Sequence, residues 1–441
     1  MGWIAALTLM LGVLIVLMAT GLPVAFAFLG IDMIGAYIFL GGQIGLDQMA
    51  RNTFAALSSF TLVPIPLFLL MGEVLFHTGV AFQAINAVDK LIARVPGRLS
   101  IVTIVGGTIF SSLSGSTIAN TAVLGSALLP DMLKRGYHPS IAMGPIMATG
   151  SIAMLIPPSA LAVLLGSLAG ISIAKLLIAG IIPGLIMSLV FLGYIVGRCS
   201  IDPTLAPADD EAATLSARDR WLPFFKYVAP LFAIFILVVG SILGGFATPT
   251  ESAAIGTVAS IIAALAYRKL TLDNFITSLL ETAKISVMIL FIIAASVTFS
   301  QILAFSGATN GLLNLINGVG ASELALILAM MAILLFLGCF VVQVSMIMIT
   351  PPFFIPLAQT ADINLLWFGV LMLIAMEISF TTPPFGLLIY VLKGVAPPHI
   401  TIRQVYMAAL PFIGLELLVL ALIVIWPAVA TWLPNIMQAN R

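Results

Sequence analysis

Charge is scarce in this chain. Only 8% of its 441 residues are charged whereas 61% are hydrophobic, and 17 Lys and Arg residues balance 17 Asp and Glu residues. Soluble domains carry about a quarter charged residues, so this composition excludes an ordinary soluble protein. The zero net charge also leaves no basic face for nucleic acid. We therefore expect an all-α polytopic membrane protein, whose apolar helices of about 20 residues each cross the bilayer.

Residues for metal, redox and nucleotide chemistry are missing as well. The two cysteines, Cys199 and Cys339, and the three histidines are scattered, so the chain offers neither a disulfide framework nor a metal cluster. It contains no Gly-x-x-x-x-Gly-Lys-Ser/Thr loop for ATP and no Gly-x-Ser-x-Gly elbow. We predict that the protein is not an enzyme and has no organic cofactor. The N-terminus lacks the basic segment of a cleaved signal, so residues 3–20 are expected to form the first span.

The chain repeats itself at an offset of 226 residues. Several turn-forming residues of the first half fall on identical residues of the second without a gap: Pro23 on Pro249, Gly30 on Gly256, Pro130 on Pro356, and Pro157-Pro158 on Pro383-Pro384. Repeats of this size are typical of secondary transporters. We predict a first repeat at 1–197, a charged cytoplasmic linker at 198–226 and a second repeat at 227–441. The alternative is a duplicated structural bundle without transport function.

Lys and Arg residues predict the topology, because cytoplasmic loops collect them. The loops at 89–98 and 131–139 are basic, so the segment between them, about 99–130, should enter and leave by the cytoplasmic face as a re-entrant hairpin. Its mate, about 325–356, is flanked by loops without Lys or Arg and should enter from outside. Each inverted repeat then has about five transmembrane helices and one hairpin, with both termini outside.

The first hairpin carries an unusual polar stretch, residues 110–121. Unsatisfied polar groups in hydrocarbon cost several kcal/mol, so such a stretch must be buried in protein or line a wet cavity. Its neutral oxygens suit Na⁺, its half-helix N–H groups suit an anionic substrate, and a glycine lets the backbone turn. The candidate binding residues are Ser111, Ser114, Gly115, Ser116, Thr117 and Asn120. The alternative is a small-residue patch for helix packing.

Two Pro-Pro pairs interrupt apolar spans, at 141–169 and 367–396. A proline has no N–H, so the carbonyl four residues earlier loses its helical partner. We expect Pro157 and Pro158 to free the carbonyls of Ala153 and Met154, and Pro383 and Pro384 to free those of Ser379 and Phe380. The candidate site residues at the breaks are Ala153, Ile156, Pro157, Pro158 and Ser159 in the first half, and Ser379, Thr381, Thr382, Pro383 and Pro384 in the second.

The second hairpin is less polar than the first. Its candidates are Gly338, Gln343 and Ser345, so the first hairpin should supply more of the polar contacts. Glu377 precedes the second break; it is either a functional ionisable group at membrane depth or a paired structural carboxylate. Glu251 follows a proline beside hydroxyl residues, which favours a helix-capping role over an ion site.

Four stretches together resemble the large membrane subunit of the tripartite ATP-independent periplasmic (TRAP) transporters, the DctM-like family. They are Ser-Gly-Ser-Thr-Ile-Ala-Asn-Thr-Ala (114–122) continuing to 137, Ile-Pro-Pro-Ser (156–159) with 178–184, Ala-Thr-Pro-Thr-Glu-Ser-Ala-Ala-Ile-Gly (247–256) and Glu-Ile-Ser-Phe-Thr-Thr-Pro-Pro-Phe-Gly (377–386). They occur in order over nearly the whole chain. The second hairpin departs from the family pattern, because Val342 stands where many relatives have an acidic residue.

The resemblance implies an Na⁺-coupled importer of organic acids, such as dicarboxylates or sugar acids, in the inner membrane of a bacterium or archaeon. It implies an elevator mechanism with scaffold and transport domains, a small four-helix membrane subunit and a periplasmic substrate-binding protein. One Na⁺ would lie near Ser111, Ser114, Ala153, Ile156 and Pro158, and a second near Gly338, Ser379 and Thr382.

Two other functions stay open at this point. A stand-alone ion-coupled carboxylate or anion transporter could share the same wider architecture. An intramembrane enzyme or a channel would need an activated nucleophile, a metal cluster or a continuous polar pore, and the sequence shows none of these.

Overall fold

The computed structural model describes residues 2–92, 95–114, 116–207 and 216–439, and these form helices and turns only. The helices of the first half are α1 (Trp3–Ala19), α2 (Val24–Phe39), α3 (Gln43–Leu57), α4 (Pro64–His77), α5 (Val80–Leu91), α6 (Arg98–Ser114), α7 (Thr117–Lys134), α8 (Pro139–Ile152), α9 (Ala160–Leu168), α10 (Ile173–Ala179), α11 (Ile181–Ile201) and α12 (Ala217–Pro223). Part of the predicted linker, residues 208–215, lies outside the described residues.

The second half is helical as well. Its helices are α13 (Ala229–Leu243), α14 (Pro249–Ala266), α15 (Leu272–Phe305), α16 (Ala308–Val319), α17 (Glu323–Gly338), α18 (Gln343–Ile349), α19 (Pro351–Thr360), α20 (Leu365–Thr381), α21 (Leu387–Val395), α22 (Ile402–Ile425) and α23 (Ala428–Ala439). Shifted by 226 residues, the range of α6 becomes 324–340, which overlaps α17. The range of α8 becomes 365–378, which lies within α20. We keep the repeat as a proposal that this correspondence supports.

Several helices are long and apolar enough to cross a membrane. Among the described residues there are six such segments, which include α14, α15 and α22, and shorter apolar helices such as α1 and α2 accompany them. Large hydrophobic side chains, including Phe246 and Leu272, lie on the outer surface, where a soluble protein would carry charge. The prediction of an all-helical, multi-pass membrane protein is therefore confirmed.

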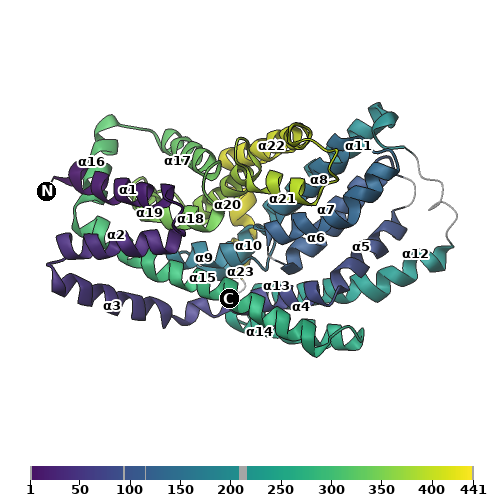
Figure 1. The fold of residues 1–441 in the computed structure, drawn as a ribbon, viewed down its shortest axis with the longest axis horizontal. Helices are drawn as coiled ribbons and strands as arrows, with labels where there is room; N and C mark the ends of the chain where they lie inside the picture. Colours follow the sequence, from purple (N-terminus) through teal and green to yellow (C-terminus); the bar gives the residue numbers. More distant parts are fainter. Residues whose placement is uncertain (1, 93–94, 115, 208–215, 440–441) are drawn as a thin grey trace.

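The two halves interlock. In what we call the outer part (α1–α4 and α13–α15), α2 of the first half packs against α15 of the second, and α4 packs against α14 and α15. In what we call the central part (α6–α9 and α17–α21), α8 packs against α6 and α7, and α7 packs against α21; α22 packs against α8. Figure 1 shows α21 and α22 beside α7 and α8, and α14 along the lower edge of the molecule. Each part of the protein is thus built from both halves.

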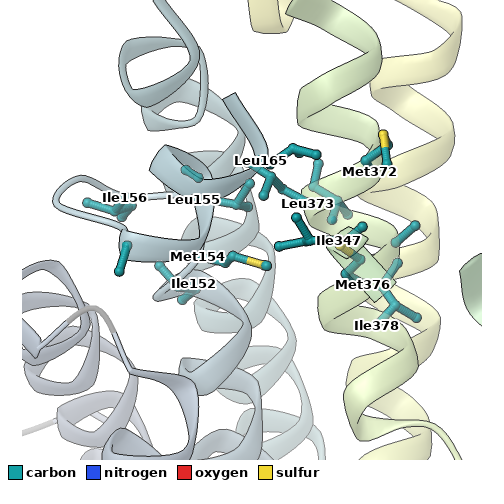
Figure 2. Packing of buried hydrophobic residues seen from close by; sticks show 14 of the residues in the cluster. Ile152, Met154, Leu155, Ile156, Leu165, Ile347, Met372, Leu373, Met376 and Ile378 are labelled. Atoms are coloured by element: carbon teal, nitrogen blue, oxygen red, sulfur yellow. The ribbon is translucent and has the colours of Figure 1, made fainter. Parts of the chain in front are cut away.

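Apolar side chains fill the space between the first Pro-Pro break and the second half. Met154, Leu155 and Ile156 of the break are 1–3% exposed. They lie across from Ile347 of α18 and Met376 of α20 (Figure 2). This apolar packing joins the first break to α18 and α20 of the second half.

Candidate functional site

The polar stretch of the first hairpin lies at the turn between α6 and α7. These helices contact each other and both contact α8. The Ser116 hydroxyl caps α7 by accepting a hydrogen bond from the N–H of Ala119 at 3.3 Å. Helix α6 ends at Ser114, and Gly115 and the side chain of Ser114 lie outside the described residues. The cap uses one of the candidate hydroxyls to begin the return helix.

Three groups from this hairpin and α8 form a closed hydrogen-bond network. The Ser111 hydroxyl donates to the carbonyl of Thr149 at 2.9 Å, and the Asn120 amide donates to the same carbonyl at 3.0 Å. The amide also donates to the Ser111 hydroxyl. Ser111, Asn120 and Thr149 are all fully buried. The network fixes the two arms of the hairpin against α8.

Three buried oxygen atoms of this hairpin and the first break have no hydrogen-bond donor among the described residues. The Asn120 Oδ1 atom is buried, and no described residue donates a hydrogen bond to it. Within the described part of the chain, no group donates to the carbonyls of Ala153 and Met154 either, as the Pro rule predicts. Buried acceptors without donors are what a hard cation such as Na⁺ requires, since it binds oxygen atoms. The donor set of the first half therefore fits Na⁺.

The first break is held by close backbone packing. Pro157 and Pro158 lie in the turn between α8 and α9, and their peptide bond is cis. The backbone of Gly180 lies against the Leu155 carbonyl, and an added Cβ at Gly184 would lie 2.6 Å from the Ile156 side chain. Ser159 caps α9 by accepting from the Ala162 N–H at 3.2 Å. The glycines of the 178–184 stretch thus allow the next helix to approach the break.

The second break corrects one expectation. The carbonyl of Ser379 is not free, because the Thr382 N–H donates to it at 3.1 Å in a tighter turn. The prediction missed this bond because it considered only the N–H four residues later, as in an α-helix. The tighter 3₁₀-type turn uses the N–H three residues later. The Phe380 carbonyl receives no hydrogen bond from the described residues, and the Pro384 carbonyl accepts from the Tyr406 hydroxyl at 2.8 Å.

Side chains at the second break bond mainly to their own helix. The hydroxyl of Ser379 donates to the Met376 carbonyl at 2.8 Å, and that of Thr382 donates to the Ile378 carbonyl at 2.6 Å. The Thr381 hydroxyl lies 3.5 Å from the Glu377 carbonyl oxygen. Pro383 and Pro384 form the second cis peptide bond. Fewer free oxygens remain here than at the first break.

The second hairpin packs tightly onto this break. Gly338, the last residue of α17, lies against Ser379 so closely that a methyl group would overlap its side chain. Gln343 and Ser345 of α18 are 4% and 1% exposed. The structure thus brings Gly338 and Ser379 together, as the candidate second site requires.

Glu377 joins the two hairpins. Its Oε1 atom accepts a hydrogen bond from the Thr117 hydroxyl at 2.7 Å, although 260 residues separate them. The side chain of Gln343 approaches the same carboxyl group from the second hairpin. Glu251, in contrast, forms a capping box with Thr248, so its structural role is confirmed.

Two buried acids were missed at the sequence level. Glu416 on α22 and Asp32 on α2 are 1% and 0% exposed, and no described residue donates a hydrogen bond to their carboxyl oxygens. Both stand inside apolar runs, which is the signal that could have identified them. The contribution of the Thr149 backbone carbonyl had no sequence signal at all.

A polar cavity lies between the outer and central parts. Its volume is about 460 Å³, which is within the usual range for small-molecule sites. Hydroxyl and amide side chains from the turn after α3, from α9 and from α15 line it, and Pro351 and Pro352 close one side: Ser59, Thr61, Ser167, Ser296, Ser300 and Gln301. The Ser296 hydroxyl also donates to the Met348 carbonyl of the second hairpin at 3.3 Å.

Comparison with known families gives a match over most of the chain. The profile of the family described as "Tripartite ATP-independent periplasmic transporter, DctM component" matches residues 11–429. The C4-dicarboxylate TRAP transporter large permease protein DctM of Rhodobacter capsulatus is 31% identical over 97% of this chain and 98% of its own length. The sialic acid TRAP transporter large permease protein SiaM of Vibrio cholerae is 29% identical over 95% and 96%.

A longer relative and two solved structures extend the comparison. The isethionate TRAP transporter permease protein DctMQ of Oleidesulfovibrio alaskensis is 28% identical over 97% of this chain but only 66% of its own length. The Alcanivorax borkumensis YdaH transporter superposes with a TM-score of 0.59 over 89% of both chains at 15% identity. Neisseria gonorrhoeae MtrF gives 0.62 over 88% of this chain and 85% of its own at 14% identity. At such identities these two structures show a shared fold alone.

Proposed function

The chain belongs to the DctM component family of TRAP transporters, a family of membrane permeases and not of enzymes, and from this premise we propose that it is the transmembrane subunit of an Na⁺-coupled importer of organic acids in the inner membrane. The observation that carries the proposal is the buried network of Ser111, Asn120 and Thr149 beside unpaired oxygens. Neutral oxygens at a helix break are how secondary transporters bind Na⁺.

The substrate class follows from the relatives and the cavity. The relatives named above are permeases for a C4-dicarboxylate, sialic acid or isethionate, all of which are acids. Ser296, Ser300 and Gln301 provide hydroxyl and amide donors for a carboxylate in the 460 Å³ cavity. We place the substrate there, between α15 on one side and α9 and α19 on the other.

The position of this cavity supports an elevator movement. The central part (α6–α9 and α17–α21) would act as the transport domain, and the outer part (α1–α4 and α13–α15) would act as the scaffold. A thiol cross-linker joining Leu168→Cys to Val297→Cys, which line the cavity from the two parts, should stop transport. Full uptake after complete cross-linking would contradict the movement.

Partners complete the importer. The family is that of a tripartite system, so we propose a small four-helix membrane subunit and a periplasmic substrate-binding protein as the other components. Exposed hydrophobic residues such as Phe232, Ile236 and Val258 give the outer helices α13 and α14 an apolar surface. That surface can contact lipid or the small subunit.

Uptake into proteoliposomes tests the proposal. The chain is reconstituted with its small subunit, and labelled C4-dicarboxylate, sialic acid and isethionate are offered with the cognate binding protein, with and without an inward Na⁺ gradient. Uptake should require both the gradient and the binding protein. Equal uptake without the gradient would overturn Na⁺ coupling, and uptake without the binding protein would favour a stand-alone transporter.

A further inference from the structure

The polar cavity between the outer and central parts has an uncharged wall. None of the described residues that line it is charged, so an acid bound there relies on neutral hydrogen-bond donors. Two of the hydroxyls are already engaged, because Ser296 donates to the Met348 carbonyl at 3.3 Å and Ser300 donates to the Ser296 carbonyl at 2.9 Å. Gln301 of α15 supplies the only amide group among the described lining residues. The direction of this amide therefore matters for an acid.

Gln301 is held by a chain of amides from α3. The Gln48 Nε2 atom donates to the Asn52 Oδ1 atom at 2.9 Å, one helical turn along α3, and the Asn52 Nδ2 atom donates to the Gln301 Oε1 atom. Helices α3 and α15 pack against each other, which brings Asn52 and Gln301 together. Within the described part of the chain, no group accepts a hydrogen bond from the Gln301 Nε2 atom. Its NH₂ group is thus left for the cavity that Gln301 lines.

The order of donors and acceptors in this chain fixes the amide in one direction. Each amide has an oxygen that accepts and an NH₂ group that donates. Since Gln48 already donates to the Asn52 oxygen, Asn52 offers its NH₂ group to Gln301, and the Gln301 oxygen turns toward α3. A carboxylate accepts hydrogen bonds and cannot donate them, so it pairs with the NH₂ group of Gln301 and not with its oxygen.

Packing alone does not explain an amide at position 52. Asn52 is 7% exposed, and a buried amide needs hydrogen-bond partners that a leucine would not need. Buried residues near it on α3 and next to Gln301 on α15 are apolar, such as Met49 and Ile302. An amide pair between these two helices therefore points to a role beyond holding them together.

We propose that Asn52 is a positioning residue for substrate recognition. Through its bond to Gln301 it directs the NH₂ group of that amide to the cavity, so that the site favours a carboxylate or another acidic oxygen group over a neutral group that donates hydrogen bonds. This inference rests on the proposed function, which places an organic acid in the cavity. Both side chains belong to helices of the outer part, so this element of specificity is separate from the two helix breaks.

Asn52→Asp should invert the amide and so tests the proposal. An ionised aspartate there keeps the bond from Gln48 but can only accept, so Gln301 must donate to it and turn its own oxygen to the cavity. The chain with its small subunit, in nanodiscs at pH 8 with Na⁺, is titrated with succinate, sialic acid and isethionate. The acid that the wild type binds is then compared with its primary amide. The wild type should prefer the acid, and in Asn52→Asp the ratio of acid affinity to amide affinity should fall at least about tenfold.

The aspartate also adds a negative charge, and a double-variant cycle separates the two effects. Gln301→Leu removes the amide, so adding Asn52→Asp to Gln301→Leu should lower the ratio by only about twofold, through the charge alone. A fall of the same size in both backgrounds would overturn the proposal. Should Asn52→Asp fail to fold, the neutral variant Gln48→Leu at an exposed position of α3 replaces it. This variant frees the Asn52 amide to turn and should lower the ratio about threefold, and an unchanged ratio would then overturn the proposal.

A matched control makes the same chemical change elsewhere. Asn310→Asp alters an exposed residue of α16 that does not line the cavity, so both affinities should stay as in the wild type. If Asn52→Asp folds and keeps the wild-type ratio, the orientation by Asn52 is wrong, whereas binding of the acid still supports the proposed function. If the wild-type complex binds none of the three acids, both proposals fail.

Discussion

The two hairpins have similar helix arrangements but different side chains at equivalent positions. In the first half, Ser111, Asn120 and the Thr149 carbonyl form a buried polar network. The residues at the same places in the second half are Leu337, Met346 and Ala375, all apolar. Met346 there lies near Gly338 and Ser379 instead of making amide hydrogen bonds. On the proposed repeat, equivalent positions of the two halves therefore keep their packing, while the first half carries most of the polar groups.

The largest effect is expected from Asn120→Met, which gives the first hairpin the residue that the second hairpin has at the same place. Asn120→Met removes both amide hydrogen bonds and the unpaired Oδ1, and it leaves Ser111 without its amide donor. Leaving a buried polar group unsatisfied costs about 1–3 kcal/mol, and each loss of about 1.4 kcal/mol in binding free energy weakens binding about tenfold. We therefore expect Na⁺ binding to weaken by at least about tenfold. The Na⁺ concentration for half-maximal uptake measures this. Met346→Leu, its counterpart in the second hairpin, should leave that value within about twofold, and an equal effect of both would contradict the asymmetry.

The first Pro-Pro break should likewise contribute more to Na⁺ binding than the second. Pro157→Ala should restore a helical donor to the Ala153 carbonyl and so remove an Na⁺ ligand. Pro383→Ala should act less, because the Ser379 carbonyl already accepts from Thr382. We expect initial uptake rates to fall several-fold more in Pro157→Ala than in Pro383→Ala, with expression unchanged. The opposite order would show that the free carbonyls of the first break do not bind the ion.

Tight packing at the second hairpin gives a smaller effect, on stability. Gly338→Ala forces a methyl group into Ser379, and overpacking of this kind costs about 1–3 kcal/mol. Thermal unfolding in detergent should begin at a lower temperature. Gly193→Ala in α11 is the matched control, since nothing lies within 4 Å of its added methyl group. Combining Gly338→Ala with Ser379→Gly should recover part of the loss, and no recovery would contradict the contact.

The smallest effect concerns helix starts. Helix α14 begins with the Thr248 and Glu251 capping box, whereas its counterpart α2 follows Pro23 without a side-chain cap. Glu251→Ala should lower the temperature of thermal unfolding slightly and leave the Na⁺ dependence of uptake unchanged. A changed Na⁺ dependence would give Glu251 a role in ion binding that the structure does not suggest.

The sequence predicts the class of this fold well because composition and apolar runs set it. Family membership follows from motifs such as Ile156–Ser159, which the family match confirms. The site is harder, because its key contacts join distant residues. The bond from Thr117 to Glu377 depends on how the hairpin meets α20, and no local rule gives this.

Rules based on local sequence also fail where a carbonyl can accept a hydrogen bond from more than one N–H group. The Pro rule correctly frees the Ala153 carbonyl, but at Ser379 a tighter turn supplies the Thr382 N–H instead. Glu416 stood in an apolar run and could have been found, whereas the Thr149 carbonyl could not. The sequence identifies which side chains could bind an ion. Only the packing of the two halves determines which of these side chains lie close together.

The interlocking of the halves bears on how the protein is made. The main packing partners of α2 and α4 are α15 and α14, which lie more than 170 residues later in the chain. A ribosome that has released the first half therefore leaves these helices in the bilayer without the neighbours they need. Folding must wait for the second half, so premature termination near residue 226 should yield a product that membrane proteases degrade.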